Sequence, residues 1–269
     1  MDRSAPPDID AIARRRDAAL VIAREAAALL QTYKLAPDAH LKGVGDLVTA
    51  ADKASEVHIL GRLGALFPDD AVIAEEGGAR ERADAEWLWC VDPLDGTTNF
   101  VHGLPHYGVS IGALHRGVPT VGVIVAPELG PRVWVAGRGL GATVDGRPIR
   151  VSANDRLDLA LVATGHPYDR SWRAAEIIPA VGRALTHCLD VRRLGSAALD
   201  LAHVAQGTFG VFWEPRLKVW DLVAGVVLVE EAGGRVSDHA GGDGYLDSGD
   251  VVASNGVLHE RFLRDVIAR

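Results

Sequence analysis

The segment Asp92-Pro-Leu-Asp-Gly-Thr-Thr98 constrains this chain most, because it marks the end of a strand and the start of a polar turn. The apolar run Trp87–Val91 precedes it and predicts a buried strand. Pro93 stiffens a turn that separates two carboxylates by three positions, and Gly96 follows with two threonines. Such carboxylates can hold hard divalent cations, and the free N–H groups of the turn can bind a phosphate.

The bulk properties predict one globular unit. The chain has 269 residues, of which 48% are hydrophobic and 24% charged, so residues 1–269 can form a single domain with a large core. We expect residues 1–7 to be a flexible tail. The net charge of −8, without any run of Lys or Arg matching a phosphate backbone, argues against direct nucleic-acid binding.

The sequence also predicts a cytoplasmic location without membrane contact. Charged residues interrupt the N-terminal apolar stretch, so no secretory segment is expected. No apolar run approaches the roughly 18 residues that a membrane span needs. Cys90 and Cys188 lie far apart without a CxxC spacing, which argues against a disulfide framework.

Hydrophobic periodicity predicts helices that alternate with short strands. We expect helices at 9–33, 52–67, 171–185, 196–207, 221–232 and 258–267. We expect strands at 71–74, 87–91, 107–114, 120–126, 133–136, 142–144, 149–151, 159–164, 191–194 and 251–253. The strands of residues 107–136 should be consecutive and antiparallel, and Asp145–Gly146 should form a hairpin turn. This mixture indicates an α+β fold of stacked layers.

Two further acidic positions fall where they can join the Asp92 turn. Glu75 ends the strand 71–74, and Asp221 is predicted as the N-cap of a helix that stops at Gly233–Gly234. Mg²⁺ takes octahedral oxygen ligands, which Glu75, Asp92, Asp95 and Asp221 provide. Taken singly, these residues are typical of a turn, a surface pair and a helix cap. Their coincidence favours a metal-dependent phosphatase site.

Two segments resemble the signature motifs of the inositol monophosphatase family, most closely its bacterial inositol-1-monophosphatases. They are Asp92-Pro-Leu-Asp-Gly-Thr-Thr-Asn-Phe100 and Trp220-Asp-Leu-Val-Ala-Gly225 with Glu231-Ala-Gly-Gly234. The resemblance extends to Asp46–Asp52, Ala74–Gly77 and Gly195–Asp200. It implies a layered α-β-α-β-α sandwich of the inositol monophosphatase and fructose-1,6-bisphosphatase type, a homodimer and inhibition by lithium.

The resemblance also implies metal and catalytic roles for individual residues. Two to three Mg²⁺ ions are expected in each active site. The first would bind Glu75, Asp92 and the carbonyl of Leu94, the second Asp92, Asp95 and Asp221, and a third Glu75 and water. Thr97, oriented by Asp52, would act with Glu75 to position the attacking water.

Substrate binding is implied for a further set of residues. The N–H groups of Gly96 and Thr97 would hold the phosphate, and the substrate ring would contact Asp95, Glu214 and the backbone at Ser196 and Ala197. Lys42 would lie on a loop that approaches the metals. The chain departs from the family pattern at Val219, where proline is frequent, and at Arg216, where a small residue is common. Arg216 could reshape the pocket or pair with a second negative group on the substrate.

The expected activity is therefore hydrolysis of small polyol phosphates, above all myo-inositol 1-phosphate, by direct attack of a metal-activated water. Two alternatives stay open. One is a phosphatase of the same superfamily that acts on histidinol phosphate, fructose 1,6-bisphosphate or a nucleotide phosphate. The other is a regulatory binding protein that keeps the fold and works through macromolecular partners.

Overall fold

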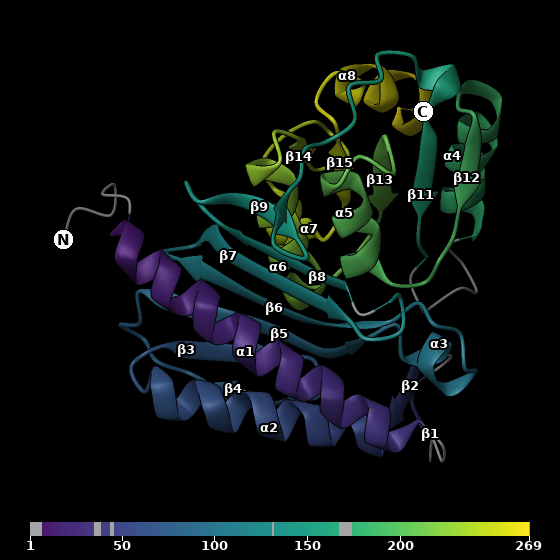
Figure 1. The fold of residues 1–269 in the computed structure, drawn as a ribbon. Coiled ribbons are helices and arrows are strands. Elements are labelled where there is room, and N and C mark those ends of the chain that lie inside the picture. Colours follow the sequence, from purple (N-terminus) through teal and green to yellow (C-terminus); the bar gives the residue numbers. More distant parts are fainter. Residues whose placement is uncertain (1–6, 35–38, 44–45, 131, 167–173, 269) are drawn as a thin grey trace.

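The computed structural model describes residues 7–34, 39–43, 46–130, 132–166 and 174–268 (Figure 1). Residues 1–6 of the predicted tail and residues 171–173 of the predicted helix 171–185 therefore lie outside the described part. The helices are α1 (Ile9–Tyr33), α2 (Ala50–Leu66), α3 (Thr97–Val101), α4 (Ala174–His187), α5 (Ala197–Ala205), α6 (Val219–Glu231), α7 (Tyr245–Ser248) and α8 (His259–Phe262). A 3₁₀ turn spans Leu157–Leu159, and a π turn spans Leu263–Ile267.

The larger sheet has eight strands in the order β10-β9-β8-β7-β6-β5-β3-β4. Their bounds are β3 (Ala71–Ala74), β4 (Ala79–Arg80), β5 (Trp87–Asp95), β6 (Gly108–His115), β7 (Val118–Ala126), β8 (Arg132–Gly137), β9 (Gly141–Val144) and β10 (Arg147–Pro148). The strands from β5 to β9 pair antiparallel in sequence order, as predicted for residues 107–136. Among the described residues of this sheet, only β3 and β5 pair in parallel.

A second sheet of five strands has the order β12-β11-β13-β15-β14. These strands are β11 (Leu161–Thr164), β12 (Asp190–Arg192), β13 (Val211–Glu214), β14 (Arg235–Ser237) and β15 (Val251–Ser254). A separate hairpin joins β1 (Ala39–Gly43) to β2 (Asp46–Thr49). Pairing of β11 with β12 and β13 is parallel, and the remaining pairs of this sheet are antiparallel.

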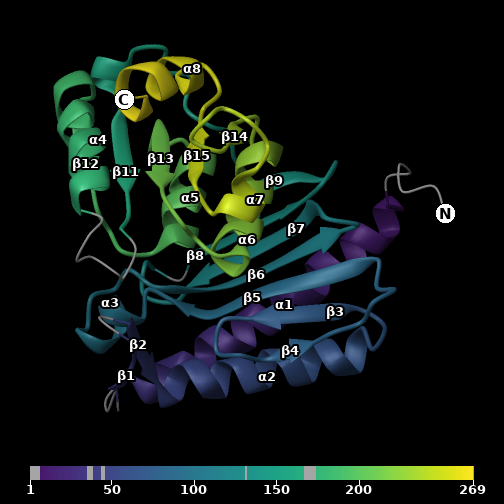
Figure 2. The same cartoon turned by 180° about the vertical axis from the view of Figure 1, so that it is seen from behind.

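The layers stack as helix, sheet, helix, sheet and helix. Figures 1 and 2 show α1 and α2 on one side of the larger sheet, α5 and α6 between the sheets, and α4 and α8 beyond the second sheet. Each interface has its own apolar cluster: α1 and α2 pack on the larger sheet, α5 and α6 fill the middle, and α4 and α8 pack on the smaller sheet. The predicted layered α+β sandwich is confirmed.

Helix α6 lies unusually close to the larger sheet because the facing strands present glycines. A Cβ atom on Gly122 would stand 2.2 Å from the carbonyl oxygen of Ala224, and one on Gly112 would stand 2.7 Å from the Ala224 nitrogen. These two side-chain-free positions let the helix backbone rest directly on β6 and β7. The close packing fixes the start of α6, which carries Asp221.

Several predicted boundaries were right and others were wrong. Helix 9–33 and strand 71–74 match α1 and β3, and the Asp145–Gly146 turn forms with positive φ angles of 51° and 75°. The predicted strand 149–151 is wrong, because β10 ends at Pro148. The Ile149 N–H still donates to the Ala142 carbonyl of β9, but the Val151 N–H donates to the carbonyl of Ala232 instead. The predicted N-cap at Asp221 is also wrong, since α6 begins at Val219 and Lys218 is its N-cap. Within the part of the chain that the structure describes, no helix is both long and apolar enough to cross a bilayer.

Candidate active site

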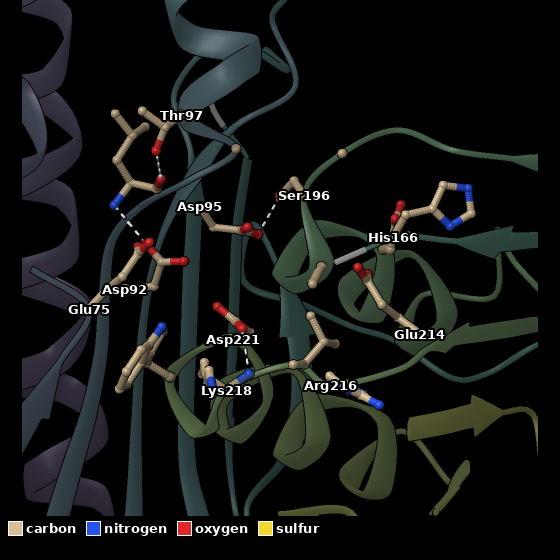
Figure 3. A pocket seen from close by; sticks show the side chains of 18 of the residues that line it. Glu75, Asp92, Asp95, Thr97, His166, Ser196, Glu214, Arg216, Lys218 and Asp221 are labelled. Atoms are coloured by element: carbon tan, nitrogen blue, oxygen red, sulfur yellow. Dashed lines mark hydrogen bonds between the residues drawn. The ribbon is translucent and has the colours of Figure 1, made fainter. Parts of the chain in front are cut away.

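One pocket of about 480 Å³ collects the sequence-predicted site residues from distant parts of the chain. It lies where the end of β5 meets the start of α5, the end of β13 and the start of α6. Its lining residues are Glu75, Asp92, Leu94, Asp95, Gly96, Thr97, Gly165, His166, Arg193, Gly195, Ser196, Ala197, Asp200, Glu214, Pro215, Arg216, Leu217, Lys218, Trp220 and Asp221. In Figure 3 the carboxylates of Asp92, Asp95 and Asp221 point toward one space, with Glu75 beside Asp92 and Glu214 across the pocket.

The Asp92 turn continues β5, which extends four residues beyond the predicted end at Val91. Pairing with β6 is irregular between Asp92 and Asp95, so these two carboxylates emerge at the bulged end of a buried strand. Asp92 Oδ1 accepts a hydrogen bond from the N–H of Leu94 at 2.9 Å, which fixes the turn. Gly96 follows with φ of 92°, and a Cβ there would stand 3.0 Å from the His106 carbonyl oxygen. Glycine is therefore required at this position.

Asp52 and Thr97 are brought together across 45 residues. The Thr97 hydroxyl lies 2.9 Å from Asp52 Oδ1 and 3.1 Å from the carbonyl oxygen of Leu94, so it can donate to either. Asp52 Oδ2 accepts hydrogen bonds from the N–H and hydroxyl of Thr49, in a capping box at the start of α2. The carboxylate that caps this helix thus also orients the Thr97 hydroxyl.

Asp95 joins the end of β5 to the start of α5. Its Oδ2 accepts from the hydroxyl of Ser196 at 2.5 Å and from the N–H of Ala198 at 2.8 Å. Asn99 strengthens the same junction, because its side-chain amide donates to the carbonyl of Leu194 at 2.8 Å. Ser196, the N-cap of α5, and Ala197 therefore lie at the pocket wall because Asp95 holds them there.

Asp221 enters the pocket as the third residue of α6. Its Oδ2 accepts from the N–H of Lys218 at 2.7 Å, which secures the first turn of the helix. The departure from proline at Val219 does not misplace this helix start, since Val219 is its first residue and Asp221 still faces the other carboxylates.

The acidic residues raise one another's proton affinity. Burial and the neighbouring carboxylates of Glu75, Asp95 and Asp221 raise the pKa of Asp92 well above its usual value. Burial, and then the charge of Asp95, likewise raises the pKa of Asp221. A cluster of buried oxygen ligands that repel one another suits a hard divalent cation, which would neutralise them. Among the described residues, however, no three His, Cys, Asp or Glu side chains already stand in a metal-binding arrangement.

The opposite half of the pocket is formed by Glu214, Gly165, Asp200 and Arg193. Burial raises the pKa of Glu214 to about 8. The Glu214 carboxylate lies directly over Gly165, where a Cβ atom would stand 1.9 Å from Oε2. Arg216 lines the rim with a left-handed backbone, φ of 63°, and its N–H donates to Asp250 Oδ1 at 3.0 Å.

All the site residues expected from the sequence thus border this pocket, apart from two. Asp52 lies behind Thr97, and Lys42 belongs to β1 with its side chain outside the described part. Asp200 and Arg193 were missed as pocket residues. The signal that points to Asp200 is a carboxylate inside the apolar helical run Ala197-Ala-Leu-Asp-Leu-Ala202, where a polar side chain needs a reason.

Comparison with known proteins defines the family. The model of the inositol monophosphatase family matches residues 11–268. The chain belongs to the inositol monophosphatase family, whose members are generally metal-dependent.

Individual relatives agree with this assignment. The chain is 43% identical to the chloroplastic phosphatase IMPL1 of Arabidopsis thaliana over 84% of its own length, and the match spans 62% of that longer protein. It is 42% identical to the Nus factor SuhB of Escherichia coli K12, with 87% of this chain and 88% of the relative covered. The solved inositol monophosphatase of Anabaena superposes with a TM-score of 0.85 at 41% identity, covering 93% of this chain and 94% of that one.

Proposed function

We propose that this protein is a Mg²⁺-dependent phosphomonoesterase that hydrolyses small polyol phosphates, with myo-inositol 1-phosphate as its preferred substrate. The observation that carries the proposal is the convergence of Glu75, Asp92, Asp95 and Asp221 on one pocket in a member of this family. Glu214 lies across the pocket from them, where its carboxylate would contact a polyol ring.

The metal-binding half of the pocket would hold two to three Mg²⁺ ions. Glu75, Asp92 and the Leu94 carbonyl are the ligands for one ion, Asp92, Asp95 and Asp221 for the second, and Glu75 for a third. When bound, the ions lower the pKa of a water and neutralise charge on the leaving oxygen. The raised pKa values of Asp92 and Asp221 support this assignment, because cations offset the repulsion that raises them.

Thr97 and Glu75 position the attacking water in this proposal. The Thr97 hydroxyl has one proton, and the two groups that it contacts, Asp52 Oδ1 and the Leu94 carbonyl oxygen, are acceptors. Its lone pairs therefore remain available to accept a hydrogen bond from a water. Asp52 acts on the water only through Thr97.

Substrate would be held from two sides. The N–H groups of Gly96 and Thr97 lie in the turn that opens α3 and can donate to phosphate oxygens. Asp95, Glu214 and the backbone at Ser196 and Ala197 supply acceptors and donors to the ring hydroxyls. Arg216 on the rim could also meet a second negative group of the substrate.

A substrate panel with and without Mg²⁺ tests the proposal. Phosphate release is measured from inositol 1-phosphate, histidinol phosphate, fructose 1,6-bisphosphate and nucleotide phosphates. We expect Mg²⁺-dependent turnover with the highest kcat/KM for inositol 1-phosphate. A preference for another ester would keep the metal mechanism and reject the inositol assignment, and a lack of turnover on every ester would reject both.

A second candidate function is regulatory, and the similarity to relatives named Nus factor SuhB favours it. In this case the fold would work through a partner in transcription. Co-purification with RNA polymerase subunits tests this candidate, with a variant that lacks phosphatase activity as the control for substrate effects. The absence of any enriched transcription protein would reject it.

Homodimer formation, lithium inhibition and a cytoplasmic location are further proposals that depend on family membership. Light scattering after size exclusion measures the oligomeric state. Titration of phosphatase activity with Li⁺ at fixed Mg²⁺ tests inhibition, because Li⁺ would occupy a Mg²⁺ position.

A further inference from the structure

Asp200 is a buried carboxylate that no described residue stabilises by a hydrogen bond. It lies in the first turn of α5, is 1% exposed and lines the pocket. Its Oδ1 is sealed from solvent without a partner. In this respect it differs from Asp92, Asp95 and Asp221, each of which accepts at least one hydrogen bond.

The groups nearest Asp200 do not neutralise it. His106 Nε2 stands 4.0 Å from Oδ1, too far for a hydrogen bond, and is itself sealed without a partner. Burial lowers the pKa of His106 to about 4, so the ring is neutral and forms no ion pair at pH 7. Arg193 attracts the carboxylate electrostatically, but no hydrogen bond joins the two.

Such a group is costly to bury unless something else satisfies it. An unpaired carboxylate in a low-dielectric site destabilises the folded protein, and native structures rarely keep one without a functional reason. Burial and the charges of Glu214 and Asp95 raise the pKa of Asp200 well above its usual value. Asp200 therefore lines the same pocket as Asp95, in the metal half, and Glu214, in the ring half, and interacts with the charges of both.

Glu214 is a second buried pocket carboxylate of this kind. It is 8% exposed, lines the pocket and has no hydrogen bond from any described residue. Two acceptor-rich side chains thus share one wall of the pocket, with Arg193 beside them. Hydroxyl groups are the neutral donors that complement carboxylates, and a ring with several hydroxyls can satisfy both.

We propose that Asp200 is a substrate-binding residue, a second hydroxyl acceptor beside Glu214, and that it selects polyol phosphates with at least two hydroxyls remote from the ester. The inference rests on the proposed phosphatase function and specifies its substrate class. A bound water could satisfy Asp200 instead, and the experiment separates that case.

The test compares two phosphate esters that share a six-membered ring. myo-Inositol 1-phosphate has the ring hydroxyls, and cyclohexyl phosphate lacks them. The variants are Asp200→Asn, which keeps one acceptor oxygen, and Asp200→Leu, which removes both. Asp155→Asn, at an exposed loop position, is the matched control.

We expect Asp200→Leu to lower kcat/KM for the inositol ester about 30-fold or more, since a site built for hydroxyls loses a polar partner. Turnover of cyclohexyl phosphate should stay within about 3-fold of the unmodified protein, because that ester has no hydroxyl to lose. Asp200→Asn should lie between, and Asp155→Asn should change neither ester.

Thermal unfolding gives a second readout. We expect the ligand-free Asp200→Leu protein to melt at the same temperature as the unmodified protein or higher, because an unsatisfied buried carboxylate is removed. A clear drop in the melting temperature would assign Asp200 a structural role and overturn the proposal.

The remaining outcomes also decide the question. Equal losses on both esters would overturn the inference, and so would unchanged kinetics on both, the result expected if only water contacts Asp200. If the unmodified protein prefers the inositol ester and Asp200→Leu keeps that preference, this inference alone fails. If the unmodified protein hydrolyses no phosphate ester, the proposed function fails together with it.

Discussion

Asp52 shows how one residue serves both the fold and the site. One of its oxygens caps α2 through Thr49, and the other accepts the hydrogen bond of Thr97. The orientation of the Thr97 hydroxyl therefore depends on the first turn of a helix that lies on the opposite side of the larger sheet from α6. A motif that looks local in the sequence is held by a distant helix terminus.

The first prediction concerns Asp92, the proposed ligand of two ions. Asp92→Asn takes an anionic ligand away from both ions. It should lower kcat about 100- to 1000-fold, since bound cations contribute several kcal/mol of transition-state stabilisation. Calorimetric titration should show weaker Mg²⁺ binding, while circular dichroism should show an unchanged fold. Asp155→Asn is the charge-matched control. Retained turnover in Asp92→Asn would contradict the metal assignment.

The second prediction concerns His259, a buried histidine remote from the pocket. The Ser237 hydroxyl donates its one proton to the Asp238 carbonyl, so it can only accept from His259 Nε2. Nδ1 lies 2.8 Å from the Ser254 hydroxyl, which accepts from the Gly256 N–H and has its own proton to donate to Nδ1. The ring is therefore neutral with its proton on Nε2. Burial lowers the pKa of His259 to about 4 from 6.5, so the unfolded chain takes up a proton first as pH falls.

The contribution of His259 to the free energy of unfolding should therefore be complete above pH 6.5 and should fall by about 3 kcal/mol between pH 6.5 and 4. Thermal melts across this range compare the unmodified protein with His259→Gln. The variant should lose less stability over the same interval, because its amide does not titrate. An identical pH slope in both proteins would show that His259 does not contribute.

The site residues that the sequence predicted share one property, which is membership in a motif with a recognisable spacing. Asp92, Asp95, Glu75, Asp221 and Glu214 all border the pocket. Asp200 and Arg193 were missed because neither spacing nor charge pattern shows that a side chain lacks partners. Only the packed structure reveals that a carboxylate is buried without a hydrogen bond.

At the scale of elements, periodicity located most helices and strands but not their ends. β5 continues to Asp95 because the bulge opposite β6 keeps the ladder going past Val91. α6 starts at Val219, before the predicted cap, because the carboxylate of Asp221 reaches back to the N–H of Lys218. Strands β13 and β14 were not predicted from the periodicity.

The third prediction tests the contact between α6 and the larger sheet. Gly122→Ala places a Cβ 2.2 Å from the Ala224 carbonyl oxygen, so the helix must move. We expect a loss of about 1–3 kcal/mol in the free energy of unfolding, measured by urea denaturation. Phosphatase activity should fall as well, because α6 carries Asp221.

Gly61→Ala is the matched control for this substitution. Gly61 lies in α2 on an exposed face, with nothing within 4 Å of the added Cβ. Alanine there should stabilise the protein by about 0.5–1 kcal/mol through helix propensity. Equal effects at Gly61 and Gly122 would show that close packing of α6 is not what Gly122 provides.

At the scale of the whole molecule, the pocket lies at the junction of both sheets and the helices between them. Glu75 and the Asp92 turn come from the larger sheet, Glu214 from the smaller one, and Asp200 and Asp221 from α5 and α6. Cations that bind here would hold these layers together. The cations would then offset the repulsion among carboxylates that come from different layers of the sandwich.

The fourth prediction follows from this arrangement. Mg²⁺ should raise the melting temperature, with a stabilisation of about 2.7 kcal/mol at a concentration 100 times the dissociation constant. EDTA should reverse the shift. Asp92→Asn should melt higher than the unmodified protein without metal and respond less to Mg²⁺. A melting temperature that is independent of Mg²⁺ in the unmodified protein would count against a structural effect of the metal.

The sequence by itself determined the family, the layered fold class and the residues that carry charge to the site, because each depends on residue type and local spacing. Only the tertiary structure decided which of those residues share a pocket and which buried groups lack partners. The physical reason is that hydrogen bonding and burial are properties of packed surroundings. The carboxylates of Asp200 and Glu214 owe their burial and their charged neighbours to segments that are far apart in the chain.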